Sequence, residues 1–120
     1  MSNVLILDDN LARHREFDRI LTGIPRKHVY TAPQAIAALR DNPPFDLVCL
    51  DHDLGDFENR FLRDDPGTGA DVALFINLHL DRSKYPKKVM VHSWNTEGAK
   101  RMSDLIRRVG IPVTVKPFHI

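Results

Sequence analysis

Side chains that can carry out chemistry gather where short apolar runs of this sequence end. Such runs are typical of strands in a parallel sheet that is covered on both faces. In open parallel sheets, ligands bind beyond the carboxyl ends of the strands, so polar residues at those ends are predicted to share one site. Four groups have this placement: Asp8-Asp9 after Val4–Leu7, Asp51-His52-Asp53 at the end of Asp46–Asp51, His92-Ser93-Trp94-Asn95 at the end of Lys88–Ser93, and Lys116 at the end of Val113–Lys116.

The acidic members of this set predict a divalent metal. Carboxylates brought to one edge of a sheet repel one another unless a hard cation joins them, and Mg²⁺ (or Mn²⁺) prefers oxygen ligands at about 2.1 Å. The predicted ligands are Asp8, Asp9, Asp51 and Asp53. As alternatives, the first three are helix caps and solvated strand ends, and Asp53 is a turn former.

The remaining polar residues predict a pocket for a phosphoryl group. Ser93 can donate a hydrogen bond to a phosphoryl oxygen, and Lys116 can neutralise its charge. A lysine at a buried strand end needs a partner, which the acids would provide. Asn95 either orients a substrate oxygen or caps the following helix, with Thr96 as the competing cap. Cys49 lies inside a buried strand, where a thiol is expected to pack as a small apolar group.

His52 and His92 are candidates for the general acid and base, because imidazole titrates near neutral pH. With Asp51 and Lys116 they make up the predicted catalytic set. Strand alternation places His52 on the opposite face from Asp51, and His92 on the opposite face from Ser93. Either histidine is therefore alternatively a hydrogen-bonded core residue.

The elements that position these residues alternate along the chain. A helix follows Asn10 until Gly23 and Pro25, and a second helix is expected at Ala32–Asp41. Apolar residues at helical spacing predict two more helices, around residues 72–79 and 99–109, and residues 28–31 read as a weak strand. Strands alternating with helices through short links favour an α/β fold with a doubly wound, five-stranded parallel sheet.

One connection breaks this regular pattern. Residues 54–68 are polar, contain Gly and Pro, and exceed the usual 2–6 residue link of an α/β unit, which favours a functional loop. A lid or wall of the site is expected there, with Arg60 and Arg63 as the cations worth testing against a phosphorylated ligand.

Composition sets outer limits on the function. The 120 residues suit one domain spanning 1–120, and 17 Lys and Arg against 16 Asp and Glu give a net charge of +1, too balanced for a broad DNA-binding or membrane-binding surface. No apolar run approaches the roughly 20 residues of a membrane-spanning helix, and no secretory signal is visible. A single cysteine fits a reducing compartment, so a cytoplasmic location is expected.

The motifs resemble the receiver domain of two-component response regulators over nearly the whole chain. The resemblance rests on Val-Leu-Ile-Leu-Asp8-Asp9-Asn, on Asp51 in the position of the phospho-accepting aspartate, on Ser93 as the switch hydroxyl, and on Lys116-Pro117-Phe118. It implies a flavodoxin-like or receiver-like fold and a cis peptide bond before Pro117.

Other motifs depart from ordinary receivers and resemble a specialised branch. Asp51-His52-Asp53-Leu54-Gly55 with His92-Ser93-Trp94-Asn95 is similar to the family described as a cyclic-phosphate processing receiver domain. That resemblance implies metal-dependent processing of a cyclic phosphate or phosphodiester, with a phosphorylated small molecule or an RNA end as the ligand. The first alternative is a receiver that is phosphorylated on Asp51 and signals by contact with a protein partner. The second is a degenerate receiver that serves only as a binding or dimerisation module.

Overall fold

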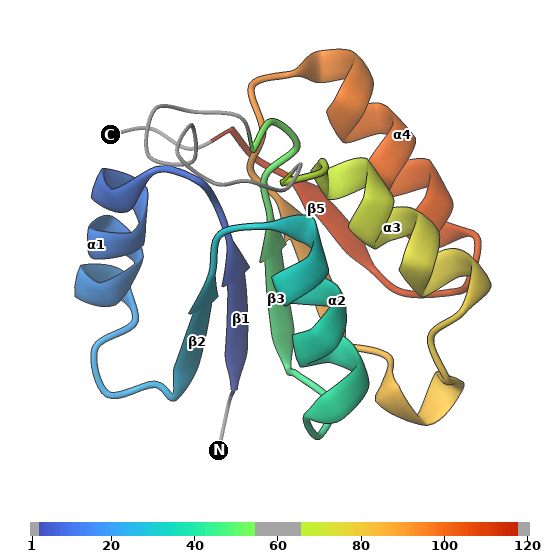
Figure 1. The fold of residues 1–120 in the computed structure, drawn as a ribbon, viewed down its shortest axis with the longest axis horizontal. Helices are drawn as coiled ribbons and strands as arrows, with labels where there is room; N and C mark the ends of the chain where they lie inside the picture. Colours follow the sequence, from blue (N-terminus) through green and yellow to red (C-terminus); the bar gives the residue numbers. More distant parts are fainter. Residues whose placement is uncertain (1–2, 55–65, 118–120) are drawn as a thin grey trace.

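The computed structural model describes residues 3–54 and 66–117. Its centre is a five-stranded sheet in the order β2-β1-β3-β4-β5, in which every neighbouring pair is parallel (Figure 1). The elements are β1 (Val4–Leu7), α1 (Leu11–Ile20), β2 (Arg26–Val29), α2 (Ala32–Asp41), β3 (Leu47–Leu50), α3 (Gly69–Leu78), the 3₁₀ turn η2 (Arg82–Lys84), β4 (Lys88–Val91), α4 (Thr96–Arg107) and β5 (Val113–Val115). The predicted doubly wound α/β architecture is confirmed.

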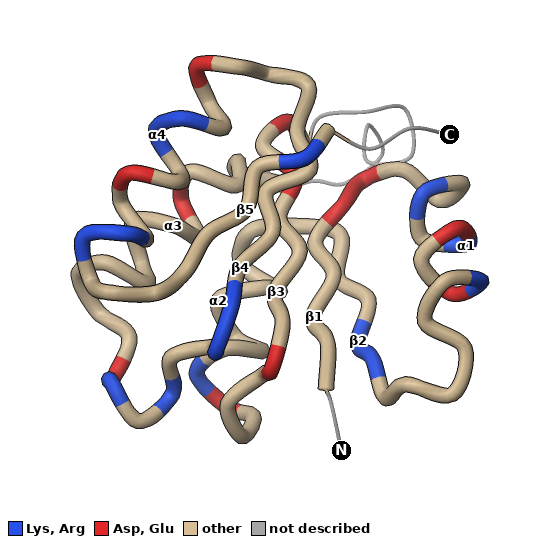
Figure 2. Tube along the Cα trace, turned by 180° about the vertical axis from the view of Figure 1, so that it is seen from behind, with Lys and Arg blue, Asp and Glu red and all other residues tan. Residues whose placement is uncertain are grey.

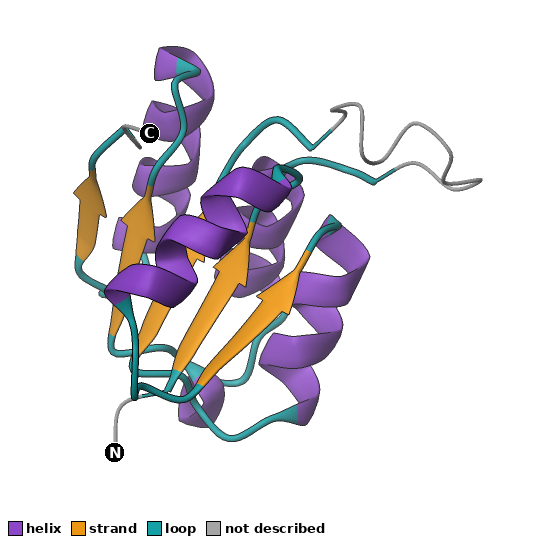
Figure 3. Ribbon diagram, turned by 90° about the vertical axis from the view of Figure 1, so that its left-hand side faces the viewer, coloured by secondary structure: helices purple, strands orange, loops and turns teal. Residues whose placement is uncertain are grey.

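Helices cover the sheet from both sides, and side-chain alternation along the strands separates two cores (Figure 3). Leu5 and Leu7 of β1 belong to the larger core with α2, α3 and α4. Val4 and Ile6 face the other way and pack with Phe17 of α1. Successive side chains of a strand point to opposite faces, so the residue after each strand continues this alternation. Asp8 therefore emerges on the α1 side of the sheet.

The second strand lies two residues earlier than the sequence indicated. It spans Arg26–Val29 rather than 28–31, with Ile6 opposite His28 in the parallel register. Thr31 is not available to the strand because it is the N-cap of α2, where its hydroxyl accepts a hydrogen bond from the backbone N–H of Gln34 at 3.3 Å. The capping preference of threonine prevailed over its strand propensity.

The peptide bond between Lys116 and Pro117 is trans, so the cis bond implied by the receiver resemblance is wrong for this chain. The trans form is intrinsically favoured before proline by about 0.5–1 kcal/mol. Both residues line an apolar hollow beside Phe17, Cys49 and Met90 on the α1 side. Lys116 thus lies against this hollow and not among the acids.

Basic residues are scattered among acidic ones along the described part of the chain (Figure 2). In the view of Figure 2 they are spread over several helices, strands and loops and alternate with acidic ones. Within residues 3–54 and 66–117, no helix is long and apolar enough to cross a membrane.

Gly69, the first residue of α3, lies directly against the strand end that carries Asp51. Its backbone N–H donates to the carbonyl oxygen of His52 at 2.9 Å. A Cβ at this position would overlap the carbonyl oxygen of Asp51 and lie 2.6 Å from Cε of Met102. Only glycine lets α3 begin this close to the end of β3.

We predict that Gly69→Ala lowers the free energy of unfolding by about 1–3 kcal/mol, because a backbone atom cannot move aside as a side chain can. Gly98→Ala is the comparison, because its Cβ would meet a side chain, the ring of His52, and no backbone atom, so a smaller loss is expected. Urea unfolding followed by circular dichroism measures both. An unfolding midpoint for Gly69→Ala equal to that of the unsubstituted protein would contradict the close approach.

Candidate metal and phosphate site

Three carboxylates meet at the carboxyl end of the sheet. Asp8, Asp9 and Asp51 each offer an oxygen within 4.8 Å of the other two, and all three residues are buried. The pairing of Leu7 with Leu50 in adjacent strands brings the following residues, Asp8 and Asp51, side by side. The convergence of strand ends that the sequence indicated is thus present for these three acids.

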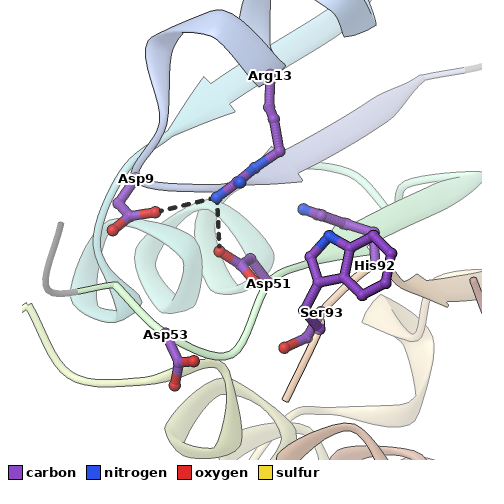
Figure 4. Close-up of a pocket in the computed structure, with 7 residues that line it drawn as sticks. Asp9, Arg13, Asp51, Asp53, His92 and Ser93 are labelled. Atoms are coloured by element: carbon purple, nitrogen blue, oxygen red, sulfur yellow. Dashed lines mark hydrogen bonds and ion pairs between the residues drawn. The ribbon is translucent and has the colours of Figure 1, made fainter. Parts of the chain in front are cut away.

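The guanidinium of Arg13 lies among these acids (Figure 4). Its Nε donates to Oδ2 of Asp8 at 2.7 Å, and its Nη2 donates to Oδ1 of Asp8 at 2.8 Å. The same Nη2 lies 3.4 Å from Oδ1 of Asp9 and 3.3 Å from Oδ2 of Asp51. Asn10 caps α1, because its side chain accepts a hydrogen bond from the backbone N–H of Arg13 at 3.1 Å. This cap holds the first turn of α1 in place, and from that turn the side chain of Arg13 extends to the acids.

Sequence reasoning did not single out Arg13. Two signals were available: buried acids need a counter-charge, and Arg13 stands four residues after Asp9, in the first turn of the helix that follows the acidic pair. Attention to strand ends alone missed a side chain that reaches the site from a helix.

His92 is the histidine that faces the acids. Its Nε2 lies 2.9 Å from Oδ2 of Asp8, and both side chains are fully buried. Its ring contacts Phe17 edge-on at a centroid distance of 5.4 Å. Burial disfavours ionisation of Asp8, but the hydrogen bonds from His92 and Arg13 outweigh burial and hold the pKa of Asp8 well below its ordinary value.

Asp51 has the opposite electrostatic character. Burial, followed by the negative charge of Asp8, raises the pKa of Asp51 from 3.8 to about 7, although Arg13 acts against the rise. Its Oδ1 accepts the backbone N–H of His52 at 2.9 Å. The cluster therefore holds one firmly ionised carboxylate beside another whose charge is costly, which is the setting a cation would relieve.

His52 lies on the other face of the strand end, as alternation from Asp51 requires. Its ring packs against Gly98 of α4, and its Nδ1 lies 2.7 Å from Oδ1 of Asp53. Asn95 caps α4 by accepting the backbone N–H of Gly98 at 2.9 Å, while its Nδ2 lies 3.3 Å from Nδ1 of His52. Asn95 thus serves as the cap and also reaches the polar group at the rim, and Thr96 begins the helix instead of capping it.

A cavity of about 380 Å³ opens over the cluster. Ser93 is buried in its wall, and its Oγ accepts the backbone N–H of Asn95 at 3.0 Å. Asp53 stands at the rim with 70% of its side chain exposed, outside the carboxylate triad. The lining residues are Asp9, Arg13, Asp51, Asp53, His92, Ser93 and Trp94. Residues 55–65 of the predicted lid, with Arg60 and Arg63, lie outside the described residues.

Lys116 is separate from this cavity. Its backbone N–H pairs with the carbonyl of Val91, and its side chain lines the apolar hollow next to Phe17. Within the described part of the chain, the acids are joined by Arg13 and His92 and form no ion pair with Lys116.

A pair of histidines supports the acid cluster from behind. His14 donates from Nε2 to the backbone oxygen of Asp8 at 2.8 Å, and His28 donates from Nε2 to Oδ1 of Asp18 at 2.7 Å. Their Nδ1 atoms face each other at 2.5 Å. This chain of hydrogen bonds ties the end of β1 to α1 and β2.

Comparison with known proteins identifies the family to which this chain belongs. The sequence profile of the family described as "Cyclic-phosphate processing Receiver domain" matches residues 3–108. This chain belongs to that family of receiver domains. The matched range includes all three clustered acids, Arg13 and His92, and ends before Lys116. No curated protein matches the sequence.

Many solved structures share the fold of this receiver domain. A receiver domain from Methylobacillus flagellatus has a TM-score of 0.69 at 18% identity and covers 100% of this chain and 90% of its own. A response regulator of Thermotoga maritima in complex with Mg²⁺ and BeF gives 0.67 at 19% identity, covering 99% and 90%. The receiver domain of a Pseudomonas aeruginosa sensor histidine kinase, with magnesium in its active-site cleft, gives 0.65 at 15% identity, covering 98% and 87%. At these identities the likeness establishes the receiver fold.

The raised pKa of Asp51 predicts how stability depends on pH in the receiver domain without metal. The unfolded chain loses this proton near pH 4 and the folded protein near pH 7, so stability falls as pH rises through that window. Asp51→Asn is expected to remove this decline and to be about 1–3 kcal/mol more stable at pH 8. Urea unfolding between pH 5 and pH 8 in a chelator is the measurement.

Asp53→Asn is the matched control for this experiment. The hydrogen bond from His52 lowers the pKa of Asp53, the opposite direction from Asp51, so Asp53→Asn is expected to give no gain in stability at pH 8. Because this carboxyl is largely exposed, any loss should be small. If Asp51→Asn is less stable than the unsubstituted protein at pH 8, the charge at Asp51 is favourable and our electrostatic account is wrong.

Proposed function

We propose that this receiver domain binds a divalent cation and uses it to process a cyclic phosphate or phosphodiester. The observation that carries the proposal is a guanidinium set among three buried carboxylates in the floor of an open cavity. The family description supports the class of substrate. Cyclic nucleotides and RNA with 2′,3′-cyclic ends are the substrates of that class to test first.

Asp8, Asp9 and Asp51 are the residues proposed to hold Mg²⁺ or Mn²⁺. Their oxygens are hard donors close enough together for a single ion. The negative charge of Asp51 is unfavourable in this buried position beside Asp8, and a cation would stabilise it. When bound, the cation supplies charge that stabilises the negative oxygens of a reacting phosphate. Asp53, at the rim, is assigned to His52 rather than to the metal.

Arg13 and Ser93 are proposed to bind the phosphate. A guanidinium presents a planar fork of donors that matches two phosphate oxygens, and Arg13 already lines the cavity. Ser93 adds a hydroxyl in the same wall. This assignment gives Arg13 the cationic role that the sequence had assigned to Lys116.

The two histidines take different roles in the proposal. His92 is a positioning residue, because its Nε2 holds Asp8 in place. His52 lies on the opposite face from Asp51, is not among the residues that line the cavity, and packs against Gly98. We therefore assign it to holding Asp53 at the rim through Nδ1. Asn95 donates from Nδ2 to Oδ1 of Asp53 at 3.4 Å, which helps to hold this carboxylate at the rim.

The direct test is turnover of cyclic nucleotides and of RNA with 2′,3′-cyclic ends in Mg²⁺ or Mn²⁺. We expect hydrolysis that is abolished by a chelator and reduced about 10–100-fold in His92→Ala, because the ring that orients Asp8 is lost. His79→Ala, which removes an exposed histidine at the end of α3, is the control and should retain full activity. Absence of turnover on every such substrate contradicts the proposal.

A second candidate function is signalling by phosphorylation of Asp51. It is favoured by the receiver fold and by the Mg²⁺ in two of the similar structures, one of which also holds BeF. Asp51 lines the cavity and is therefore open to a phosphoryl donor. Output in this case is contact with a protein partner.

Acetyl phosphate separates the two functions. If Asp51 accepts a phosphoryl group, treatment with Mg²⁺ and acetyl phosphate adds the mass of one phosphoryl group, which base removes and Asp51→Asn prevents. Intact mass spectrometry is the measurement. An unchanged mass in the unsubstituted protein rules out acetyl phosphate-driven phosphorylation and favours the hydrolytic function.

A further inference from the structure

One nitrogen of Arg13 is in contact with all three carboxylates of the proposed metal site. Nη2 lies 2.8 Å from Asp8, 3.4 Å from Asp9 and 3.3 Å from Asp51. It is therefore placed where the three acids converge. The inference below builds on the proposed function, because it treats these acids as the ligands of a divalent cation.

A divalent cation and this guanidinium cannot share the same oxygens. Mg²⁺ needs its oxygen ligands at about 2.0–2.1 Å and in near-octahedral geometry, which leaves no room for a nitrogen between them. Their like charges also repel at this range. Binding of the cation therefore requires Nη2 to withdraw from Asp9 and Asp51, where its contacts are longest.

The surroundings of Arg13 allow its side chain to move without the helix. The first turn of α1 is held by the cap at Asn10, so the backbone stays in place. The side chain is 21% exposed and lines the cavity together with Ser93 and Trp94. When Arg13 withdraws, His92 still holds Asp8. A displaced guanidinium would thus remain at the cavity wall, facing a ligand above the acids.

We propose that Arg13 is a built-in competitor of the metal and that its transfer from the carboxylates to a phosphate couples the binding of the two ligands. The cation alone must displace a favourable ion pair, so it binds weakly. A phosphate bound to Arg13 removes that competition, and by linkage the cation strengthens phosphate binding by the same factor. The site in this way selects a metal and a phosphate together over either one alone.

Trp94 provides the signal for a test, because it is the single tryptophan and lines the cavity. Its fluorescence is titrated with Mg²⁺, at known free concentration, with and without inorganic phosphate. For the unsubstituted protein we expect phosphate to tighten Mg²⁺ binding at least about fivefold. Arg13→Met is expected to bind Mg²⁺ alone about tenfold or more tightly than the unsubstituted protein, with the effect of phosphate lost.

Arg19→Met is the matched control, because Arg19 is an exposed arginine of the same helix that pairs with Glu16. It should behave as the unsubstituted protein. Thermal unfolding is a second readout, should Arg13→Met be unstable without metal: Mg²⁺ must raise its Tm by more than it raises that of the unsubstituted protein. Equal or weaker Mg²⁺ binding by Arg13→Met, or an unchanged effect of phosphate, overturns the inference.

The outcome is separable from that of the proposed hydrolysis. Coupled Mg²⁺ and phosphate binding without turnover of any cyclic phosphate supports the competitor role and rejects the hydrolytic function. Turnover with Mg²⁺ affinity unaffected by Arg13→Met rejects the competitor role and leaves the hydrolysis standing.

Discussion

The repulsion among the carboxylates at the ends of β1 and β3 is the constraint on which the site depends. Parallel pairing places Asp8 and Asp51 next to each other, and burial removes the water that would screen their charges. The protein answers this repulsion with a guanidinium from α1 and with a hydrogen bond from the imidazole of His92, just after β4. These partners stabilise the charge of Asp8 more than that of Asp51, and accordingly the pKa of Asp8 is lowered while that of Asp51 is raised.

This constraint links the fold to the proposed chemistry. Because the negative charge of the acids is only partly balanced, the cluster favours a further cation. The guanidinium that balances part of it belongs to a long side chain, which a metal ion can displace. Asp8 is held from several directions, by Arg13, by His92 and through its backbone oxygen by His14. Asp51 is held by fewer contacts and lines the cavity. Of these two carboxylates, Asp8 is thus the more firmly held, and Asp51 is the one that faces the cavity.

The sequence predicted the sheet and the three clustered acids well, because strand periodicity and strand-end position are local properties that the residues themselves express. Where two local preferences competed, it predicted less: Thr31 was read as strand but caps α2. Strand alternation did not determine which histidine faces the acids. In the structure, His92 lies on the α1 side of the sheet, where it contacts Phe17 and Asp8. The roles of Arg13 and Lys116 were not predictable in this way. They depend on which long side chain reaches the acids, and spacing along the chain does not determine that.

The central claim is that the three acids bind a divalent cation while Arg13 moves to a phosphate. A crystal structure of the protein soaked with Mn²⁺ and a phosphate analogue tests it most directly, because manganese is located by its anomalous scattering. The account predicts one Mn²⁺ ion bound by Asp8, Asp9 and Asp51, with the guanidinium of Arg13 on the phosphate analogue. A structure with Arg13 still between the carboxylates and no manganese among them would contradict it.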